Sequence, residues 1–386
     1  MKNSTRGQVD PFIVMDVMEA ARAAEAAGRH IIHMEVGQPS TGAPAAAIAS
    51  LRDEMSRDAL GYTVGLGLPE LRVRIARHYA EWYGVTLDPA RVVITSGASG
   101  AFILAFTALF DAGQRVGLGV PCYPSYRQIL RALDLTPVDI RTRMEHRLQP
   151  VPAQITADLD GLIVASPANP TGTMLDRDAM AALAAACDAA GVSLISDEIY
   201  HGLSYGTRAV SALEVTDEVY VINSFSKYFS MTGWRVGWMV VPQDHVRIVE
   251  RLAQNLFICA PHAAQRLALA AMDCTEELEA NVAVYAANRD VLMQGLAQAG
   301  FATLAPPDGA FYVYADVSAY TDDARAFAAE ILAEAGVAVT PGLDFDPTEG
   351  QGWLRFSYAR STEDVTEGVA RLVRFMAGRQ KMRALA

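Results

Sequence analysis

Short runs of β-branched residues alternate with helical patterns through the middle of the chain, and this alternation constrains the fold more than any other feature. The expected strands are 92–95, 115–120, 162–165, 192–196, 219–223 and 235–241, and the expected helices are 99–110, 125–133 and 176–190. Strands that alternate with helices predict an α/β fold, with a mostly parallel sheet and helices on both faces. Ligands of such sheets bind beyond the carboxyl ends of the strands, so the loops that follow the strands are the candidate site.

The end of the chain follows a different pattern. A long helix is expected over 276–299, and after it strands at 311–317, 337–340 and 353–358 alternate with helices at 323–335 and 362–377. This predicts a smaller α+β unit. Residues 1–49 have no evident place in the central sheet, and we expect them to pack on it or to join the smaller unit.

Composition excludes several classes of protein. The 386 residues include 32 basic and 44 acidic ones, a formal charge of −12, without the basic face of a nucleic-acid binder. The longest apolar stretch, 101–110, is too short to span a membrane. Four scattered cysteines form no C-x-x-C motif, the histidines lack metal-ligand spacing, and residues 1–10 lack the apolar core of a secretory signal. We expect a soluble cytoplasmic protein with no metal, nucleic-acid or membrane partner.

A glycine-containing loop joins the strand expected at 92–95 to the helix expected at 99–110. Its sequence is Thr95-Ser96-Gly97-Ala98-Ser99-Gly100. Backbone N–H groups at the start of a helix bind phosphate well, and the Ser99 hydroxyl can add a donor. The alternative is an ordinary tight turn with a helix cap. The loop is not the G-x-G-x-x-G fingerprint of dinucleotide-binding proteins.

A lysine follows a later strand, in Ser224-Phe225-Ser226-Lys227. In a dry site, desolvation favours the neutral amine, which can form a Schiff base with a carbonyl. A surface lysine is the ordinary alternative. The segment Gly233 to Gly237 favours a site, because Arg235 opens the next strand and its guanidinium suits an anion held by Ser99, Ser224 and Ser226.

Asp197 ends a strongly apolar strand in Ser196-Asp197-Glu198-Ile199-Tyr200. A carboxylate buried there costs several kcal/mol unless it meets a cation. A protonated pyridine nitrogen is one such partner, and a salt bridge or a helix cap is the alternative. Glu198 is interpreted as structural.

Three further segments place polar or aromatic groups at strand ends. Asn169 stands between prolines in Ser166-Pro167-Ala168-Asn169-Pro170, and the alternative is a simple turn. Tyr123, also flanked by a proline, can stack on a flat ring or pack in the core. Arg355 lies between apolar residues of a late strand, so it needs a carboxylate from the protein or from a substrate.

Taken in order, these segments resemble the class I and II aminotransferases, fold type I enzymes that use pyridoxal 5′-phosphate (PLP). Two earlier segments share the resemblance: Val36-Gly37-Gln38-Pro39 is similar to a substrate-side glycine loop, and Gly61-Tyr62-Thr63 with Gly67 to Arg72 is similar to a Y-x-x-x-x-G-x-x-x-L-R segment. The resemblance covers about residues 30 to 375. Each motif alone is weak evidence for the family, but the whole set in the same order is not expected by chance.

The resemblance implies a role for each matching residue. Lys227 holds PLP as a Schiff base and then moves a proton, Asp197 pairs with the pyridine nitrogen, and Tyr200 and Asn169 bond the phenolic oxygen of the ring. Tyr123 stacks on the ring, and Arg355 binds the substrate α-carboxylate near the Gly37 N–H. The phosphate is held by Ala98, Ser99, Ser224 and Arg235. Tyr62 reaches that phosphate from the other subunit, which implies a homodimer with shared sites.

The resemblance also implies an architecture and a reaction. The fold is a three-layer domain with a mostly parallel or mixed seven-stranded sheet over residues 50–275, and residues 1–49 and 276–386 form a smaller α+β domain. The enzyme moves the α-amino group of an L-amino acid to a 2-oxo acid by a ping-pong cycle. Gln38 stands where the family often has an acidic residue, and no second arginine is assigned to a side-chain carboxylate.

Other activities remain open at this point. A PLP-dependent β-lyase or decarboxylase uses the same Lys227 and Asp197. A regulatory domain without turnover is disfavoured, because residues 1–30 are too short for a DNA-binding extension and have no excess of basic over acidic residues. A dehydrogenase is disfavoured by the missing dinucleotide fingerprint.

Overall fold

A seven-stranded sheet forms the centre of the computed structural model, which describes residues 1–385. Its strands lie in the order β2-β8-β7-β6-β5-β3-β4. Strand β8 is antiparallel to both of its neighbours, and the other pairs are parallel, so the predicted mixed sheet is confirmed. The bounds are β2 Val92–Thr95, β3 Arg115–Val120, β4 Thr136–Arg141, β5 Gly161–Ala165, β6 Ser193–Asp197, β7 Tyr220–Ser224 and β8 Gly237–Val240.

Helices cover both faces of this sheet because successive strand residues point to opposite sides. Val93, Ile163 and Ile195 pack with side chains of α4 (Gly97–Leu109), α5 (Pro124–Ala132) and α7 (Val246–Leu256). Leu162, Val164 and Leu194 pack on the other side with α3 (Pro69–Tyr83), α6 (Arg177–Ala190) and α8 (His262–Ala271). The result is the predicted three-layer architecture.

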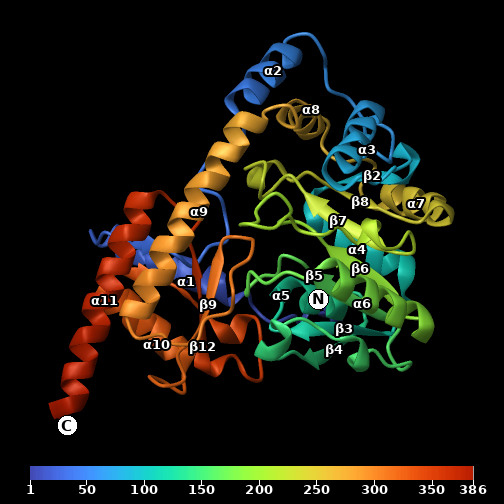
Figure 1. Cartoon of the computed structure of the whole chain (residues 1–386). Coiled ribbons are helices and arrows are strands. Elements are labelled where there is room, and N and C mark those ends of the chain that lie inside the picture. Colours follow the sequence, from blue (N-terminus) through green and yellow to red (C-terminus); the bar gives the residue numbers. More distant parts are fainter. Residues whose placement is uncertain (386) are drawn as a thin grey trace.

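A smaller group of strands lies beside the sheet. Strand β12 (Trp353–Ser357) is central and antiparallel to β11 (Thr340–Pro341) and β9 (Tyr312–Asp316). Figure 1 shows these strands among α1 (Ile13–Ala26), α9 (Thr275–Gln298), α10 (Ala324–Glu330) and α11 (Thr362–Leu385). Helix α2 (Ala45–Met55) packs against α8 instead.

The N-terminal segment joins this smaller group through one short strand. Strand β1 (Ile32–His33) pairs in parallel with β10 (Val337–Ala338). Residues 1–49 were expected either to pack on the central sheet or to join the smaller unit. For β1 the first expectation is wrong, because β1 pairs with a strand of the smaller unit. The division into domains at residues 49 and 275 stays a prediction.

Other differences from the sequence analysis are local. Strand β4, the edge strand, was not expected, and neither were α1, α2, α3, α7 and α8. Strand β8 begins at Gly237, and Arg235 precedes it with a φ of 52°, so Arg235 does not open the strand. The helix expected over 323–335 ends in a π-helical turn at Ile331–Ala335. Within residues 1–385, the structure has no helix long and apolar enough to cross a membrane.

Candidate active site

One cavity of about 340 Å³ lies beyond the carboxyl ends of the central strands. Strand ends of the sheet, the start of α4, the loop after β1 and strands β9 and β12 all contribute side chains to its wall. Most of the sequence-predicted residues line this cavity: Gly37, Ala98, Ser99, Tyr123, Asn169, Tyr200, Ser224, Lys227, Arg235 and Arg355. Asp197 and Tyr62 are not among its lining residues.

Asp197 lies behind the wall, at the end of β6, and is 1% exposed. The hydroxyl of Tyr126 donates to one carboxylate oxygen, and the backbone N–H of Ile199 donates to the other at 3.0 Å. Burial raises the pKa of Asp197 to about 6, although both hydrogen bonds oppose the shift. Within the described residues Asp197 forms no ion pair, so a buried anion remains without a bonded cation.

Lys227 follows β7 and is half-buried, with its ammonium directed at the loop after β1. Its Nζ donates to the backbone oxygen of Gly37 at 2.6 Å and lies 5.6 Å from the centre of the Tyr200 ring. Burial, and to a smaller extent the positive charge of Arg355, lower the pKa of Lys227 to about 8. The neutral, nucleophilic amine is therefore accessible near neutral pH.

The start of α4 has the properties of an anion site. Gly97 has a φ of +71°, and a Cβ there would collide with the guanidinium of Arg235. The first N–H groups of the helix have no partner within it, and the helix dipole favours negative charge there. Ser224 Oγ donates to Ser226 Oγ at 2.9 Å on the same cavity wall. Ser99 and Arg235 are exposed, so the cradle is open on one side.

Arg355 enters the cavity from β12 and is 3% exposed. Its Nη1 donates to Asn169 Oδ1 at 2.8 Å, and its Nη2 donates to the backbone oxygen of Glu35. Its guanidinium carbon lies 4.4 Å from the centre of the Tyr312 ring. Its Nε has no partner, and it forms no ion pair with a carboxylate in the described part of the chain. A buried guanidinium with neutral partners suits a carboxylate that arrives from outside.

Two functional tyrosines were missed by sequence reasoning. Tyr126 bonds Asp197, and Tyr312 bonds the hydroxyl of Tyr200 at 2.7 Å. Tyr312 also explains the glycine at position 37, because a Cβ there would overlap the Tyr312 hydroxyl. Tyr126 stands one helical turn after Tyr123 in a segment already singled out, which was a usable signal. Tyr312 carried no signal, because its closeness to Gly37 arises only from the tertiary fold.

Tyr62 is the predicted residue that the single chain does not bring to the site. Its side chain is 83% exposed, in a segment whose backbone is held by His262 and Gln265. Val64 in the same segment, Leu256 at the end of α7 and Ile258 just after it are also at least half exposed.

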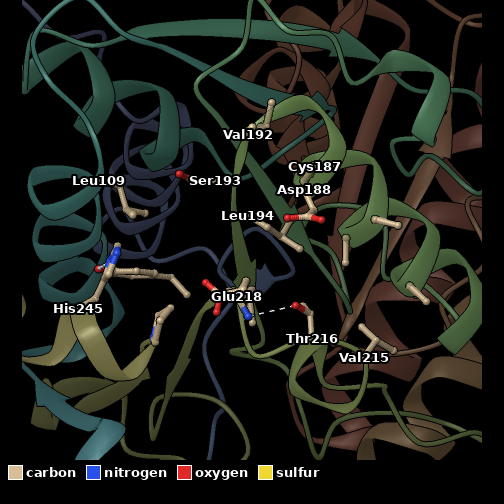
Figure 2. A pocket seen from close by; sticks show the side chains of 17 residues that line it. Leu109, Cys187, Asp188, Val192, Ser193, Leu194, Val215, Thr216, Glu218 and His245 are labelled. Carbon is tan, nitrogen blue, oxygen red and sulfur yellow. Dashed lines mark hydrogen bonds between the residues drawn. The ribbon is translucent and has the colours of Figure 1, made fainter.

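A second cavity, of about 490 Å³, lies at the amino-terminal ends of the central strands β6 and β7, and Figure 2 shows the side chains that line it. Ser193 and Leu194 of β6, Cys187 and Asp188 of α6 and His245 contribute to its wall. It holds no lysine or arginine and none of the predicted site residues. It therefore lacks the cation that a phosphate or a carboxylate needs, and the chemistry belongs to the first cavity.

Four groups of complementary chemistry lie in the wall of the first cavity or directly behind it. Among the described residues, Asp197 behind the wall lacks a cation, the start of α4 with Arg235 lacks an anion, Lys227 offers an amine, and Arg355 lacks a carboxylate. A phosphorylated ring with a protonated nitrogen would satisfy the first two groups, and an amino acid would satisfy the last. The residues present thus fit a pyridine phosphate.

Comparisons with known proteins agree with this geometry. The family model described as aminotransferase class I and II matches residues 29–372. Valine–pyruvate aminotransferase of Mycobacterium tuberculosis is 46% identical over 375 residues, which cover 95% of this chain and 96% of that protein.

Solved structures give the same result. A crystal structure from Silicibacter pomeroyi that has been assigned to the aminotransferases is 68% identical, with a TM-score of 0.94, and the match covers 98% of this chain and 100% of that one. Aspartate aminotransferase of Thermus thermophilus, solved with maleate, is 30% identical with a TM-score of 0.90, over 97% of this chain and 99% of that one.

Proposed function

Because this chain belongs to the class I and II aminotransferases, the fold type I enzymes that use PLP to move an amino group from an amino acid to a 2-oxo acid, we propose that Lys227, Asp197 and Arg355 carry out this transfer in the first cavity. One observation carries the proposal. Among the described residues, no opposite charge is bonded to the buried Asp197 or to the buried Arg355, and Lys227 opens into the cavity that Arg355 lines. Nothing in the comparisons favours the alternative lyase activity.

The chain's own residues would hold PLP at defined positions. When bound, PLP supplies an electron sink that stabilises negative charge at the substrate Cα. Asp197 would pair with the ring nitrogen and keep it protonated, and the Tyr126 hydroxyl, which donates to Asp197, would fix the orientation of that carboxylate. The first turn of α4, with Ala98, Ser99, Ser224 and Arg235, would bind the phosphate. Tyr123 would stack on the ring, and Tyr200 and Asn169 would bond the phenolic oxygen.

Lys227 has two tasks in this proposal. Its amine would attach the cofactor, and once the substrate amine has displaced it, the free Lys227 amine would take the proton from the substrate Cα and deliver it to the C4′ carbon of the cofactor. A lowered pKa suits both tasks, because a strongly basic lysine would stay protonated. Arg355 meanwhile holds the α-carboxylate, with the Gly37 N–H nearby, and so orients the Cα–H bond.

We expect the substitution Arg355→Lys to weaken the reaction of amino acids by ~1.5–3 kcal/mol in kcat/KM, because lysine keeps the charge but loses the planar fork. Steady-state rates with a series of amino acids measure this change. The absorption of bound PLP should stay nearly normal. Amines that lack a carboxylate should lose much less, and a variant that loses PLP but keeps its amino-acid affinity would show that Arg355 is structural.

We also propose that the enzyme is a homodimer with shared sites. The phosphate cradle is open where Ser99 and Arg235 are exposed, and Tyr62 projects from a surface where Val64, Leu256 and Ile258 are also exposed. A second copy of the chain that covers this surface would bring its Tyr62 hydroxyl to the open side of the cradle.

We also propose that residues 50–275 form the cofactor domain, and that residues 1–49 and 276–386 form the smaller domain. A cytoplasmic location is part of the same proposal.

Tyr62→Ala is expected to raise the dissociation constant of PLP by ~10-fold or more, since the variant loses a hydrogen bond to a charged phosphate. Equilibrium dialysis measures this constant, and sedimentation is expected to report a dimer in both proteins. Val64→Ala, in the same exposed segment, serves as the control and should leave PLP affinity unchanged. A fully active monomer would contradict the shared site.

A further inference from the structure

Helix α1 and the segment before it form one side of the cavity, a feature that the reaction described above does not use. Phe12, Val14, Met15 and Met18 line the cavity together with Lys227 and Arg355. Met15 and Met18 are three positions apart, so they lie on one face of the helix. This wall is built from apolar side chains only.

The wall is fixed in place from two directions. Asp344, which is 7% exposed, accepts from the backbone N–H groups of Ile13 at 2.9 Å and Val14 at 3.2 Å. This carboxylate caps the start of α1 and interacts favourably with its dipole. Asp344 follows β11, the strand that pairs with β12, and β12 carries Arg355. The position of α1 is therefore tied to the carboxylate-binding arginine.

The segment before α1 is attached to the central sheet's own helices. Arg131 of α5 forms an ion pair with Asp10 at 2.5 Å, and the Phe12 ring meets the edge of Tyr123, with centroids 5.9 Å apart. Figure 1 shows the N-terminus near α5 and α1 among the smaller group of strands. Residues 10–18 thus cross from one part of the molecule to the other along the cavity.

Each charged side chain in the cavity wall already has a role in the proposed function. Among its lining residues only Lys227, Arg235 and Arg355 are ionised, and the proposed function gives each of them a task. Among the lining residues of this chain, a second carboxylate on the substrate would face methionine and phenylalanine without a cation, which is costly in a partly dry site. Methionine side chains are flexible and adapt to apolar groups of different shape.

We propose that α1 is the wall against which the substrate side chain packs, and that Met15 and Met18 make the enzyme select amino acids with apolar side chains over acidic ones. This inference rests on the proposed function, because it takes Arg355 as the α-carboxylate site. Asp344 acts as a positioning residue for the wall.

The test compares methionine with glutamate, which have similar length but differ in charge. The PLP-loaded enzyme is mixed with each amino acid, and the 2-oxo acid formed is quantified to obtain kcat/KM. We expect methionine to exceed glutamate by ~10-fold or more, in line with the selectivity of apolar pockets. Glutamate equal to or better than methionine would overturn the inference while the proposed function stands. Failure of every amino acid to yield an oxo acid would overturn the proposed function itself.

Three variants locate the selectivity. Met18→Arg places a cation in the wall and should lower the methionine-to-glutamate ratio by at least ~10-fold, the effect of one hydrogen bond to a charged group. Met18→Leu should keep the wild-type ratio. Met144→Arg, at a methionine that is 38% exposed and outside the cavity, adds the same charge as a control and should leave the ratio unchanged. Equal ratios in Met18→Arg and Met144→Arg, with PLP absorption retained in both, would show that α1 does not contact the side chain.

Discussion

Replacement of Lys227 by alanine is expected to lower turnover by on the order of 10⁴-fold, which is the upper range for a positioned acid–base group. The variant loses the amine that attaches the cofactor and moves the Cα proton. Neither Tyr200 nor Tyr312, whose hydroxyls bond each other in the same cavity, can replace it, because burial raises the pKa of both phenols. The measurement is the rate of oxo-acid formation with saturating PLP.

The small number of lysines makes it easy to identify the residue that binds PLP by labelling. The chain has three lysines, Lys2, Lys227 and Lys381, so borohydride reduction of the PLP-loaded enzyme followed by peptide mapping has few sites to distinguish. We expect the label on Lys227, and capture of PLP should accelerate as pH rises through about 8, where the amine loses its proton. Lys2→Ala is the control and should react normally. A label on either terminal lysine would contradict the assignment.

Asp197→Asn is expected to retain PLP but to slow Cα deprotonation by ~10²-fold or more, because the variant cannot keep the ring nitrogen protonated. Stopped-flow measurement of substrate deuterium exchange reports this step directly. Glu198→Gln is the matched control. Burial raises the pKa of Glu198 to about 8, so the glutamine imitates a side chain that is already neutral at pH 7. A rate for Asp197→Asn within a few-fold of the wild type would refute the role.

The stability of the PLP-free protein gives a second measurement for Asp197. Its folded-state pKa, about 6, lies above the ordinary value, so the neutral form is the one that folding favours. The free energy of unfolding should therefore be highest below pH 4 for this group and fall as pH rises through about 6. Asn cannot ionise, so Asp197→Asn should lack this decline, and an equal decline in both proteins would contradict the shift.

The sequence predicted the central sheet because buried parallel strands are nearly continuous apolar runs. Strand β3, at Arg115–Val120, is the clearest example. Strand β4 was missed because it is an edge strand with Pro137 and several exposed side chains, which dilute the pattern. Strand β1 has two residues and exists only through its pairing with β10, more than 300 positions away, so no local pattern could reveal it.

The candidate site likewise has residues that the sequence predicts and residues that it does not. Asn169, Asp197 and Lys227 were predictable because each ends or follows a buried strand, and the topology brings strand ends together. By contrast, no local sequence pattern indicates that Tyr312 contacts Gly37, or that Asp344 caps α1. The α1 wall was missed for the same reason, since its contacts with the cavity join segments that are distant in sequence.

Transfer of the amino group itself can be followed with an isotope. The PLP-loaded enzyme is incubated with ¹⁵N-labelled L-methionine and a mixture of 2-oxo acids, and the products are followed by NMR. We expect the label in the amino acid formed from an added 2-oxo acid, one methionine-derived 2-oxo acid for each labelled amino acid and no labelled ammonium, and we expect Lys227→Ala to form neither product. Release of labelled ammonium without a labelled amino acid product would rule out amino transfer and identify a lyase.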